Sequence, residues 1–223
     1  MKFLYYIRYF FYIAWNWNFQ LAFFSIFHEI SGEKKYNLNT VRLDDLNELT
    51  ITGNTKQYAE IYQAASYYLL EHVFETLRQL AVPDGFVDLG CGKGRVLVVA
   101  AHYGFTRITG VDFAKELCDE ARSNCKPLTF KFPAVSWLII HSDAVDFKFE
   151  KNTHIIFLFN PFKETVMKQV IKNIRLSLKR YPRKIWVVYM NPQLKKLFLR
   201  EGFREVYYIK KMQFVEASIL EGE

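Results

Sequence analysis

Hydrophobic and polar positions follow two alternating patterns from residue 84 onward. Short apolar runs predict strands, and most are followed by a stretch in which apolar residues recur every three or four positions, which predicts a helix. The pattern predicts helices at 95–103, 114–123, 163–179 and 193–200, and strands at 86–89, 107–111, 136–141, 154–159, 184–189, 205–211 and 213–220. Alternating strands and helices are typical of a parallel sheet. We therefore predict an α/β fold, a doubly wound, mostly parallel seven-strand sheet with helices on both faces.

The pattern differs in the preceding residues. Apolar residues recur at helical spacing over 58–80, which predicts one helix before the turn at Pro83, Asp84 and Gly85. Residues 31–57 are polar and contain Gly32 and Gly53, so we expect a linker with little regular structure. These features divide the chain into an N-terminal arm and linker, 1–57, and a domain, 58–223.

The first 27 residues are rich in aromatic side chains. They lack the compact apolar region and small-residue cleavage site of a signal peptide. Residues 9–27 are nearly long enough to span a membrane, but Asn16, Asn18, Gln20 and Ser25 interrupt them. We expect a helical arm that packs on the domain or on a second subunit of a homodimer, with peripheral membrane contact through residues 1–27 as the alternative.

The stretch 86–96 carries the most informative motif, a Gly-x-Gly-x-Gly turn between a strand and a helix. Gly90, Gly92 and Gly94 let the backbone turn sharply and approach a ligand, and the helix N-terminus beyond them favours anionic groups. A dinucleotide fingerprint would place the third glycine one residue later. A P-loop would need Ser or Thr after Lys93.

Acidic residues lie at the ends of the first two predicted strands. Asp88 suits a ligand that carries a cation, such as an amino group or a sulfonium; the alternative is an aspartate that bonds turn amides. Asp112 could accept both hydroxyls of a ribose, or cap the helix that starts at Ala114. Phe113 could lie against a purine.

Polar residues also follow the third and fourth strands. Asp143 could accept a hydrogen bond from an adenine amine, whereas we expect His141 to be a packing residue. Asn160 and Pro161 offer an amide oxygen and a turn carbonyl to a substrate amine, and Phe162 could pack on that substrate. The alternative is a turn after a buried strand.

The predicted site residues occur along the chain in the same order as the motifs of a known family. Residues 87–94 resemble motif I of the class I methyltransferases that use S-adenosylmethionine (SAM). Asp112 and Asp143 are similar to that family's acidic residues after strands two and three, and residues 160–162 resemble its motif IV. The resemblance extends from residue 58 to the C-terminus and implies SAM as the cofactor.

The resemblance also implies residue roles. Gly90, Cys91 and Gly92 would border the methionine part of SAM, with Asp88 near its amino end. Asp112 would hold the ribose, and Asp143 with Ala144 the adenine.

A helix before motif I closes over the cofactor in the seven-strand protein-lysine methyltransferases, and Tyr62 is loosely similar to its tyrosine. The proline usual after that tyrosine is replaced by Ala64. Motif IV has a single proline before Phe162, which predicts against methylation of nucleic-acid bases. We expect methyl transfer to a nitrogen of an unidentified acceptor, a protein lysine or a small amine. The alternatives are a non-catalytic SAM- or nucleotide-binding interaction module and an O-methyltransferase.

Charge and cysteine content add little to this picture. The net charge is +7, and residues 163–184 hold eight Lys/Arg against one acid, which a solvated helix face or an anionic partner would explain. Cys91, Cys118 and Cys125 match no zinc pattern, and a catalytic Cys91 would have no obvious nearby base. We expect reduced thiols, no metal and a cytoplasmic location.

Overall fold

The computed structural model describes residues 2–40, 64–80, 84–159 and 162–223. Its helices are α1 (Lys2–Asn16), α2 (Phe19–Tyr36), α3 (Tyr67–Leu80), α4 (Arg95–His102), α5 (Lys115–Cys125), α6 (Leu128–Lys131), α7 (Glu164–Arg180) and α8 (Lys195–Arg200). Its strands are β1 (Phe86–Leu89), β2 (Arg107–Asp112), β3 (Ser136–His141), β4 (Ile155–Phe159), β5 (Ile185–Met190), β6 (Arg204–Lys211) and β7 (Val215–Gly222). Apart from the short α6, every element from β1 onward lies within a few residues of its predicted position.

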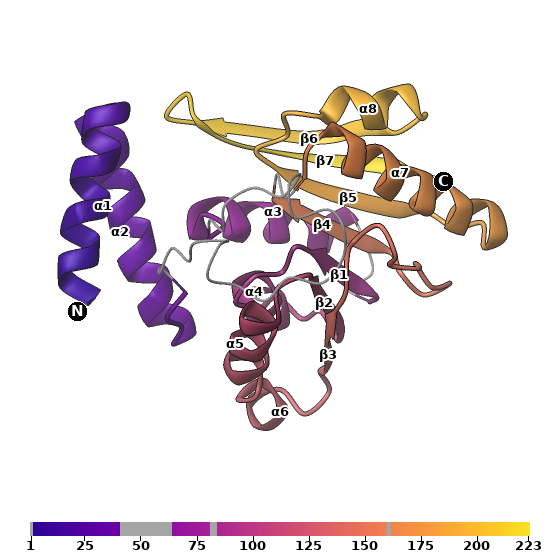
Figure 1. The fold of residues 1–223 in the computed structure, drawn as a ribbon, viewed down its shortest axis with the longest axis horizontal. Helices are drawn as coiled ribbons and strands as arrows, with labels where there is room; N and C mark the ends of the chain where they lie inside the picture. Colours follow the sequence, from indigo (N-terminus) through magenta and orange to yellow (C-terminus); the bar gives the residue numbers. More distant parts are fainter. Residues whose placement is uncertain (1, 41–63, 81–83, 160–161) are drawn as a thin grey trace.

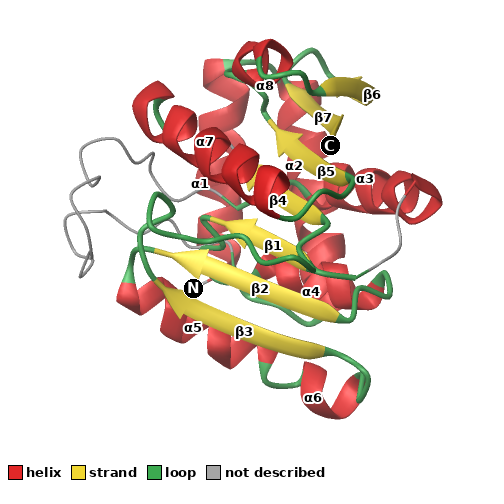
Figure 2. Cartoon of the chain, turned by 90° about the vertical axis from the view of Figure 1, so that its right-hand side faces the viewer, coloured by secondary structure: helices red, strands yellow, loops and turns green. Residues whose placement is uncertain are grey.

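The strands form one sheet in the order β3-β2-β1-β4-β5-β7-β6 (Figure 2). Strands β1 to β5 are parallel, whereas β7 is antiparallel to both of its neighbours, β5 and β6. The prediction of a mostly parallel seven-strand sheet is therefore confirmed. The chain moves outward from β1 to β3 and then returns to β4, so the strand order reverses beside β1. Ligands of such sheets bind at this reversal, beyond the carboxyl ends of the strands.

Helices cover both faces of the sheet. Alternate strand residues point to opposite sides, and apolar residues on both sides need a layer of helices to bury them. One core contains residues of α3, α4 and α5, and the other contains residues of α7 and α8. Phe86 and Phe157 belong to the first core, and their strand neighbours Val87 and Ile156 belong to the second. The sheet is thus buried on both faces, as the continuous apolar runs of its strands require.

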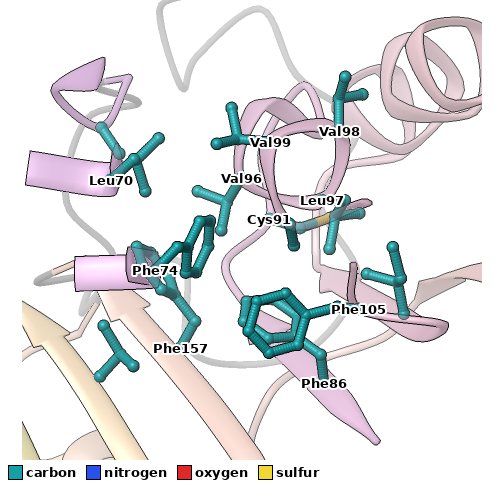
Figure 3. Close-up of a cluster of buried hydrophobic side chains, with 14 of the residues drawn as sticks. Leu70, Phe74, Phe86, Cys91, Val96, Leu97, Val98, Val99, Phe105 and Phe157 are labelled. Carbon is teal, nitrogen blue, oxygen red and sulfur yellow. The ribbon is translucent and has the colours of Figure 1, made fainter. Parts of the chain in front are cut away.

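An aromatic cluster lies in the first core, close to the glycine turn (Figure 3). Phe74 of α3 meets Phe105 and Phe86 with ring centroids 5.4 and 5.7 Å apart. Phe157 of β4 completes the cluster, and all four rings are fully buried. Rings from one helix, one loop and two strands therefore give β1 a rigid base.

The N-terminal residues fold into two helices joined at Trp17 and Asn18. The Asn18 side chain caps α2 by accepting a hydrogen bond from the Leu21 backbone N–H at 2.7 Å. In Figure 1, α1 lies on the far side of α2 from the sheet. Within the described residues, no helix is both long enough and apolar enough to cross a membrane.

This helical arm contacts the domain at two places. The α2 helix packs against α3. In addition, Ile13, Leu21 and Ala22 form a small core with Met212 and Val215 of the β6–β7 hairpin. The expectation that the arm packs on its own domain therefore agrees with these contacts.

Two predictions before residue 84 were wrong in part. We expected little regular structure over 31–57, but α2 continues to Tyr36, and Asn37 caps it in the left-handed conformation (φ 54°). A Cβ on Gly32 would lie 2.1 Å from the Tyr67 ring, so this glycine allows close packing and does not break the helix. We also expected a helix over 58–80, but residues 64–66 are not helical, α3 starts at Tyr67, and residues 58–63 lie outside the described part.

Candidate functional site

The glycine turn lies between β1 and α4 and is fixed to the end of β2. Gly90, Gly92 and Gly94 have φ values of 80°, 51° and 78°, which residues with a Cβ rarely adopt. The backbone N–H groups of Gly90 and Cys91 donate to the Val111 carbonyl at 2.8 and 3.0 Å. All three glycines are therefore required by the backbone, as the sequence indicates.

A further glycine makes room for this turn from the neighbouring strand. A Cβ on Gly110 of β2 would lie 2.6 Å from Leu97 Cδ1 and 2.8 Å from Cys91 Sγ. Figure 3 shows the Cys91 side chain beside Leu97 in the core. Gly110 thus lets the turn and α4 approach β2 closely.

Asp112 ends β2 and holds the turn through its side chain. Its Oδ2 accepts from the Gly92 backbone N–H at 2.8 Å, and its Oδ1 accepts from the Ala114 N–H at 3.0 Å. Burial raises the pKa of Asp112 to about 6, although these backbone donors act in the opposite direction. The capping alternative was wrong, because Ala114 is itself the N-cap of α5 and has no side-chain cap; the bond from the Ala114 N–H to Asp112 closes a local turn before the helix. Each carboxylate oxygen keeps a second lone pair, so contact with a ribose stays a prediction.

Asp88, the third residue of β1, has an incomplete hydrogen-bonding environment. Its side chain is 2 % exposed, and its Oδ2 has no hydrogen-bond partner among the residues that the structure describes. Burial and the nearby negative charge of Asp112 raise its pKa well above the ordinary value. Buried acceptors in proteins are nearly always bonded, and a cationic group here would complete the site and favour the ionised carboxylate. This environment fits the amino group of SAM.

The end of β3 brings two more predicted residues to the same edge. Asp143 and Ala144 are buried, and Asp143 Oδ1 accepts from the Val145 backbone N–H at 3.1 Å. His141 Nε2 lies 3.1 Å from the carbonyl oxygen of the half-buried Phe113, so the ring donates to that carbonyl. His141 is therefore tied to the backbone, in agreement with a packing role.

Cys91 is buried, and its pKa is raised well above the ordinary value by burial, then by the charges of Asp112 and Asp88. The thiol stays protonated and packs in the core, so it is a poor candidate for a nucleophile. Among the residues described, no group of three or more His, Cys, Asp or Glu side chains could hold a metal.

The predicted acceptor side is only partly described. Asn160, Pro161 and Tyr62 lie outside the described residues. Phe162 is half-buried and packs against the core formed by β1, β4 and α7. The roles of these four residues stay predictions.

Sequence reasoning missed Asn191, which follows β5. It adopts the left-handed conformation (φ 48°), is half-exposed and precedes Pro192. Strands β4 and β5 are parallel and pair Phe159 with Met190, the last residue of each. In the sequence, each of these strands is followed by Asn-Pro, and this repeated dipeptide was the signal available.

Sequence reasoning also missed Arg95, the first residue of α4. The residue is 2 % exposed, and its guanidinium lies 4.2 Å from the centre of the Tyr67 ring. It donates hydrogen bonds to Glu29 and Glu33 of α2, to Thr40 Oγ1 and to the Ala65 carbonyl. The signal in the sequence was a pair of carboxylates four residues apart, the two acids within residues 1–40.

A comparison with family models supports the methyltransferase interpretation. The model described as "Methyltransferase domain" matches residues 86–181, which run from β1 to just beyond α7. No curated protein sequence matches the chain.

Several solved structures share the fold. A Pyrococcus horikoshii protein provisionally described as an RNA methyltransferase has a TM-score of 0.53 at 18% identity, over 79% of this chain and 90% of that one. Magnesium protoporphyrin IX methyltransferase from Synechocystis, solved with bound SAM, has a TM-score of 0.51 at 15% identity, over 69% and 77%. The Pyrococcus abyssi tRNA (uracil-54, C5)-methyltransferase, solved with S-adenosyl-L-homocysteine, has a TM-score of 0.51 at 15% identity, over 82% and 44%.

The strand order and the family-model match over residues 86–181 identify the fold as that of the class I, Rossmann-like methyltransferases. Residues 86–181 therefore form a SAM-dependent methyltransferase domain. Two of the similar structures are described as RNA methyltransferases, so the comparisons do not support our sequence-based prediction against a nucleic-acid acceptor.

Proposed function

We propose that the enzyme transfers the methyl group of SAM to a nitrogen atom of a protein lysine or a small amine. The observation that carries this proposal is the pair of Asn-Pro dipeptides that follow the adjacent parallel strands β4 and β5. Carboxamide oxygens accept hydrogen bonds from an amine and can hold its lone pair in one direction. Two such groups at one edge suit a neutral nitrogen acceptor.

The cofactor side of the proposed site uses the strand-end acids. Bound SAM supplies an activated methyl group on a sulfonium. Asp88 accepts from the amino group, Asp112 from the ribose, and Asp143 with Ala144 from the adenine. Gly90, Cys91 and Gly92 lie along the methionine part, where Gly90 and Gly92 have no Cβ to obstruct it, and Phe113 packs on the purine.

The acceptor side needs positioning and does not need a covalent intermediate. An amine that has lost its proton to solvent offers its lone pair, and Asn160 directs that lone pair toward the methyl group. Pro161 makes the following turn rigid, and Phe162 supplies an apolar wall. Holding two reactants in this geometry is a large part of catalysis for a single in-line transfer.

The O-methyltransferase alternative would need a base near Asn160. His141 donates its Nε2 proton to the Phe113 carbonyl. His154 precedes β4 and therefore lies at the opposite edge of the sheet. Neither histidine supports that alternative. A non-catalytic SAM-binding module would use the same strand-end acids, so transfer of label from SAM distinguishes the enzyme from that alternative.

The test is incubation of the enzyme with radiolabelled SAM and a lysate, followed by separation of protein, nucleic acid and small molecules. We expect label in protein or in a small amine. Asn160→Ala and Asn191→Ala should each lower the turnover number more than the SAM affinity, and Asn152→Ala at the opposite edge is the matched control. Label confined to nucleic acid would refute the proposed acceptor class. Calorimetry that detects no SAM binding would refute the enzyme assignment itself.

Two further properties belong to this proposal. The free, buried state of Cys91, Cys118 and Cys125 supports a reducing, cytoplasmic compartment. We also propose that the chain divides into an arm and linker, 1–57, and a domain, 58–223, and that the arm packs on the domain.

A further inference from the structure

The outer surface of the N-terminal arm is unusually apolar. The described residues include 17 exposed large hydrophobic side chains, and ten of them lie on the arm. They are Leu4, Ile7, Phe11, Tyr12, Trp15, Trp17, Phe19, Phe23, Phe27 and Ile30. A soluble monomer rarely gathers so many exposed apolar side chains in one place unless the surface has a partner.

The spacing of these residues defines one exposed stripe on each helix. Helix α1 carries Leu4, Ile7, Phe11 and Trp15, and helix α2 carries Phe19, Phe23, Phe27 and Ile30. Steps of three and four residues keep each set on one helix face. The opposite faces supply the buried contacts between the helices and with the β6–β7 hairpin. We name the two stripes together the arm face.

Aromatic contacts join the two stripes. The Phe10 ring lies 5.5 Å from that of Phe11 on its own helix and 4.8 Å from that of Phe23 on α2. Trp17 extends the surface toward Phe214 at the tip of the β6–β7 hairpin, with ring centroids 6.3 Å apart. The arm face is therefore continuous across both helices.

The exposed charged side chains of the two arm helices between residues 4 and 34 are basic, and the neighbouring hairpin carries Lys210 and Lys211 with Glu216 opposite Lys210. Arg8 is exposed between Ile7 and Phe11, and Lys34, Lys210 and Lys211 are exposed on α2 and the hairpin. The one acid between residues 4 and 32 is Glu29, which is buried against Arg95. A second copy docked through the same helices would offer Arg8 and Lys34 no exposed acid between residues 4 and 32. Charge complementarity therefore favours an anionic surface.

We propose that the arm face docks on a membrane surface that contains anionic lipids. Aromatic side chains are favoured at the level of the lipid headgroups, and flanking Lys and Arg residues are attracted to anionic headgroups. The helices lie on the bilayer and do not cross it. Few cations lie on the face itself, which suits lipid better than the many phosphate contacts that a nucleic acid would need.

The buried Arg95 contacts fix how the docked enzyme is oriented. Glu29 and Glu33 tie α2 to the first residue of α4, which directly follows the glycine turn. The arm therefore holds the cofactor edge of the sheet in one orientation relative to the bilayer. This inference goes beyond the proposed methyl transfer and does not depend on the acceptor.

The test is flotation of the full-length protein with vesicles of phosphatidylcholine alone, or with added phosphatidylglycerol. We expect binding to the anionic vesicles that weakens at high salt. The double variant Phe11→Ser/Trp15→Ser removes side chains that are 61 % and 91 % exposed. It should lower the partition coefficient by roughly tenfold or more, because these rings no longer enter the interface. The matched control is Phe130→Ser/Leu199→Ser, which removes exposed apolar side chains on α6 and α8.

SAM binding and circular dichroism should be unchanged in both double variants, which separates lipid docking from folding and from cofactor binding. The proposal is overturned if the wild type stays unbound with anionic vesicles, or if the arm variant floats as well as the wild type. It is also overturned if light scattering shows a dimer that the arm variant abolishes, or if the arm face binds single-stranded RNA and no vesicles.

Discussion

The buried arginine at the start of α4 gives the sharpest test of how the arm is held. We consider Arg95→Met, which keeps an unbranched apolar side chain but removes the guanidinium. Arg95 Nη1 lies 2.9 Å from Glu29 Oε2, and Arg95 Nε lies 2.7 Å from Thr40 Oγ1. The side chains of Arg95, Glu29 and Glu33 are 3 %, 10 % and 5 % exposed, so water screens their contacts weakly.

Removing the cation leaves two buried carboxylates without a countercharge. Glu33 keeps bonds from the Thr40 backbone N–H and hydroxyl at 2.8 and 3.0 Å, whereas the ion pair with Arg95 supplies the side-chain partner of Glu29. Breaking a buried ion pair by removing one partner costs about 3–5 kcal/mol. Domains have an unfolding free energy of about 5–15 kcal/mol, so this cost is a large fraction of the total. We expect either a lower free energy of unfolding for the whole protein or local release of the arm.

Urea unfolding and limited chymotrypsin digestion of the aromatic arm measure these two outcomes. The matched control is Lys35→Met, which breaks an ion pair on the same helix. Lys35 and Glu71 are 56 % and 29 % exposed, so this loss should stay within about 1 kcal/mol. The double variant Arg95→Met/Glu29→Met removes both charges and should recover part of the loss.

The proposed role of Arg95 is refuted if Arg95→Met lowers the free energy of unfolding no more than Lys35→Met does and leaves digestion of the arm unchanged. It would mean that the contacts of Arg95 carry little net energy and that the apolar contacts with α3 and the hairpin hold the arm.

Two further predictions concern the cofactor edge. Asp112 has a pKa of about 6 in the folded protein and near 3.9 in an unfolded chain. The folded state therefore binds the proton more tightly, so the free energy of unfolding rises as pH falls from about 6 to about 4. Urea unfolding across this range should show about 2–3 kcal/mol more gain for wild type than for Asp112→Asn, and parallel curves would contradict this. Gly110→Ala should cost about 1–3 kcal/mol and weaken SAM binding in calorimetry, because its Cβ would meet Leu97 and Cys91 beside the turn. Gly104→Ala is the control for SAM affinity: its Cβ meets nothing within 4 Å, although its φ of 88° strains the local backbone, and equal SAM affinities in the two variants would rule out this role for Gly110.

The strands and the glycine turn could be predicted from sequence because their signals are local. Residues 155–159 and 185–190 are apolar runs of strand length, and Gly90, Gly92 and Gly94 occupy positions that only glycine adopts readily. Their order along the chain then determines which edge of a parallel sheet they share. The strand-end acids follow from the same order.

The arm could not be predicted in the same way because its signals are not local. Glu29 and Arg95 are 66 residues apart, and nothing in their spacing joins them. Gly32 suggested a break, but its meaning depends on Tyr67, which packs against it from α3. Asn191 was overlooked because an Asn-Pro turn gains interest only when β4 and β5 are known to be neighbours.

The position of β7 has a consequence for synthesis of the chain. Strand β5 is fully buried in the finished fold, but its outer edge pairs with β7, from Ile185 opposite Gly222 to Met190 opposite Ala217. Until β7 folds back onto it, β5 presents an apolar, unpaired edge, which is a site for wrong pairing between chains. The hairpin of β6 and β7 therefore protects the newest part of the sheet as it forms.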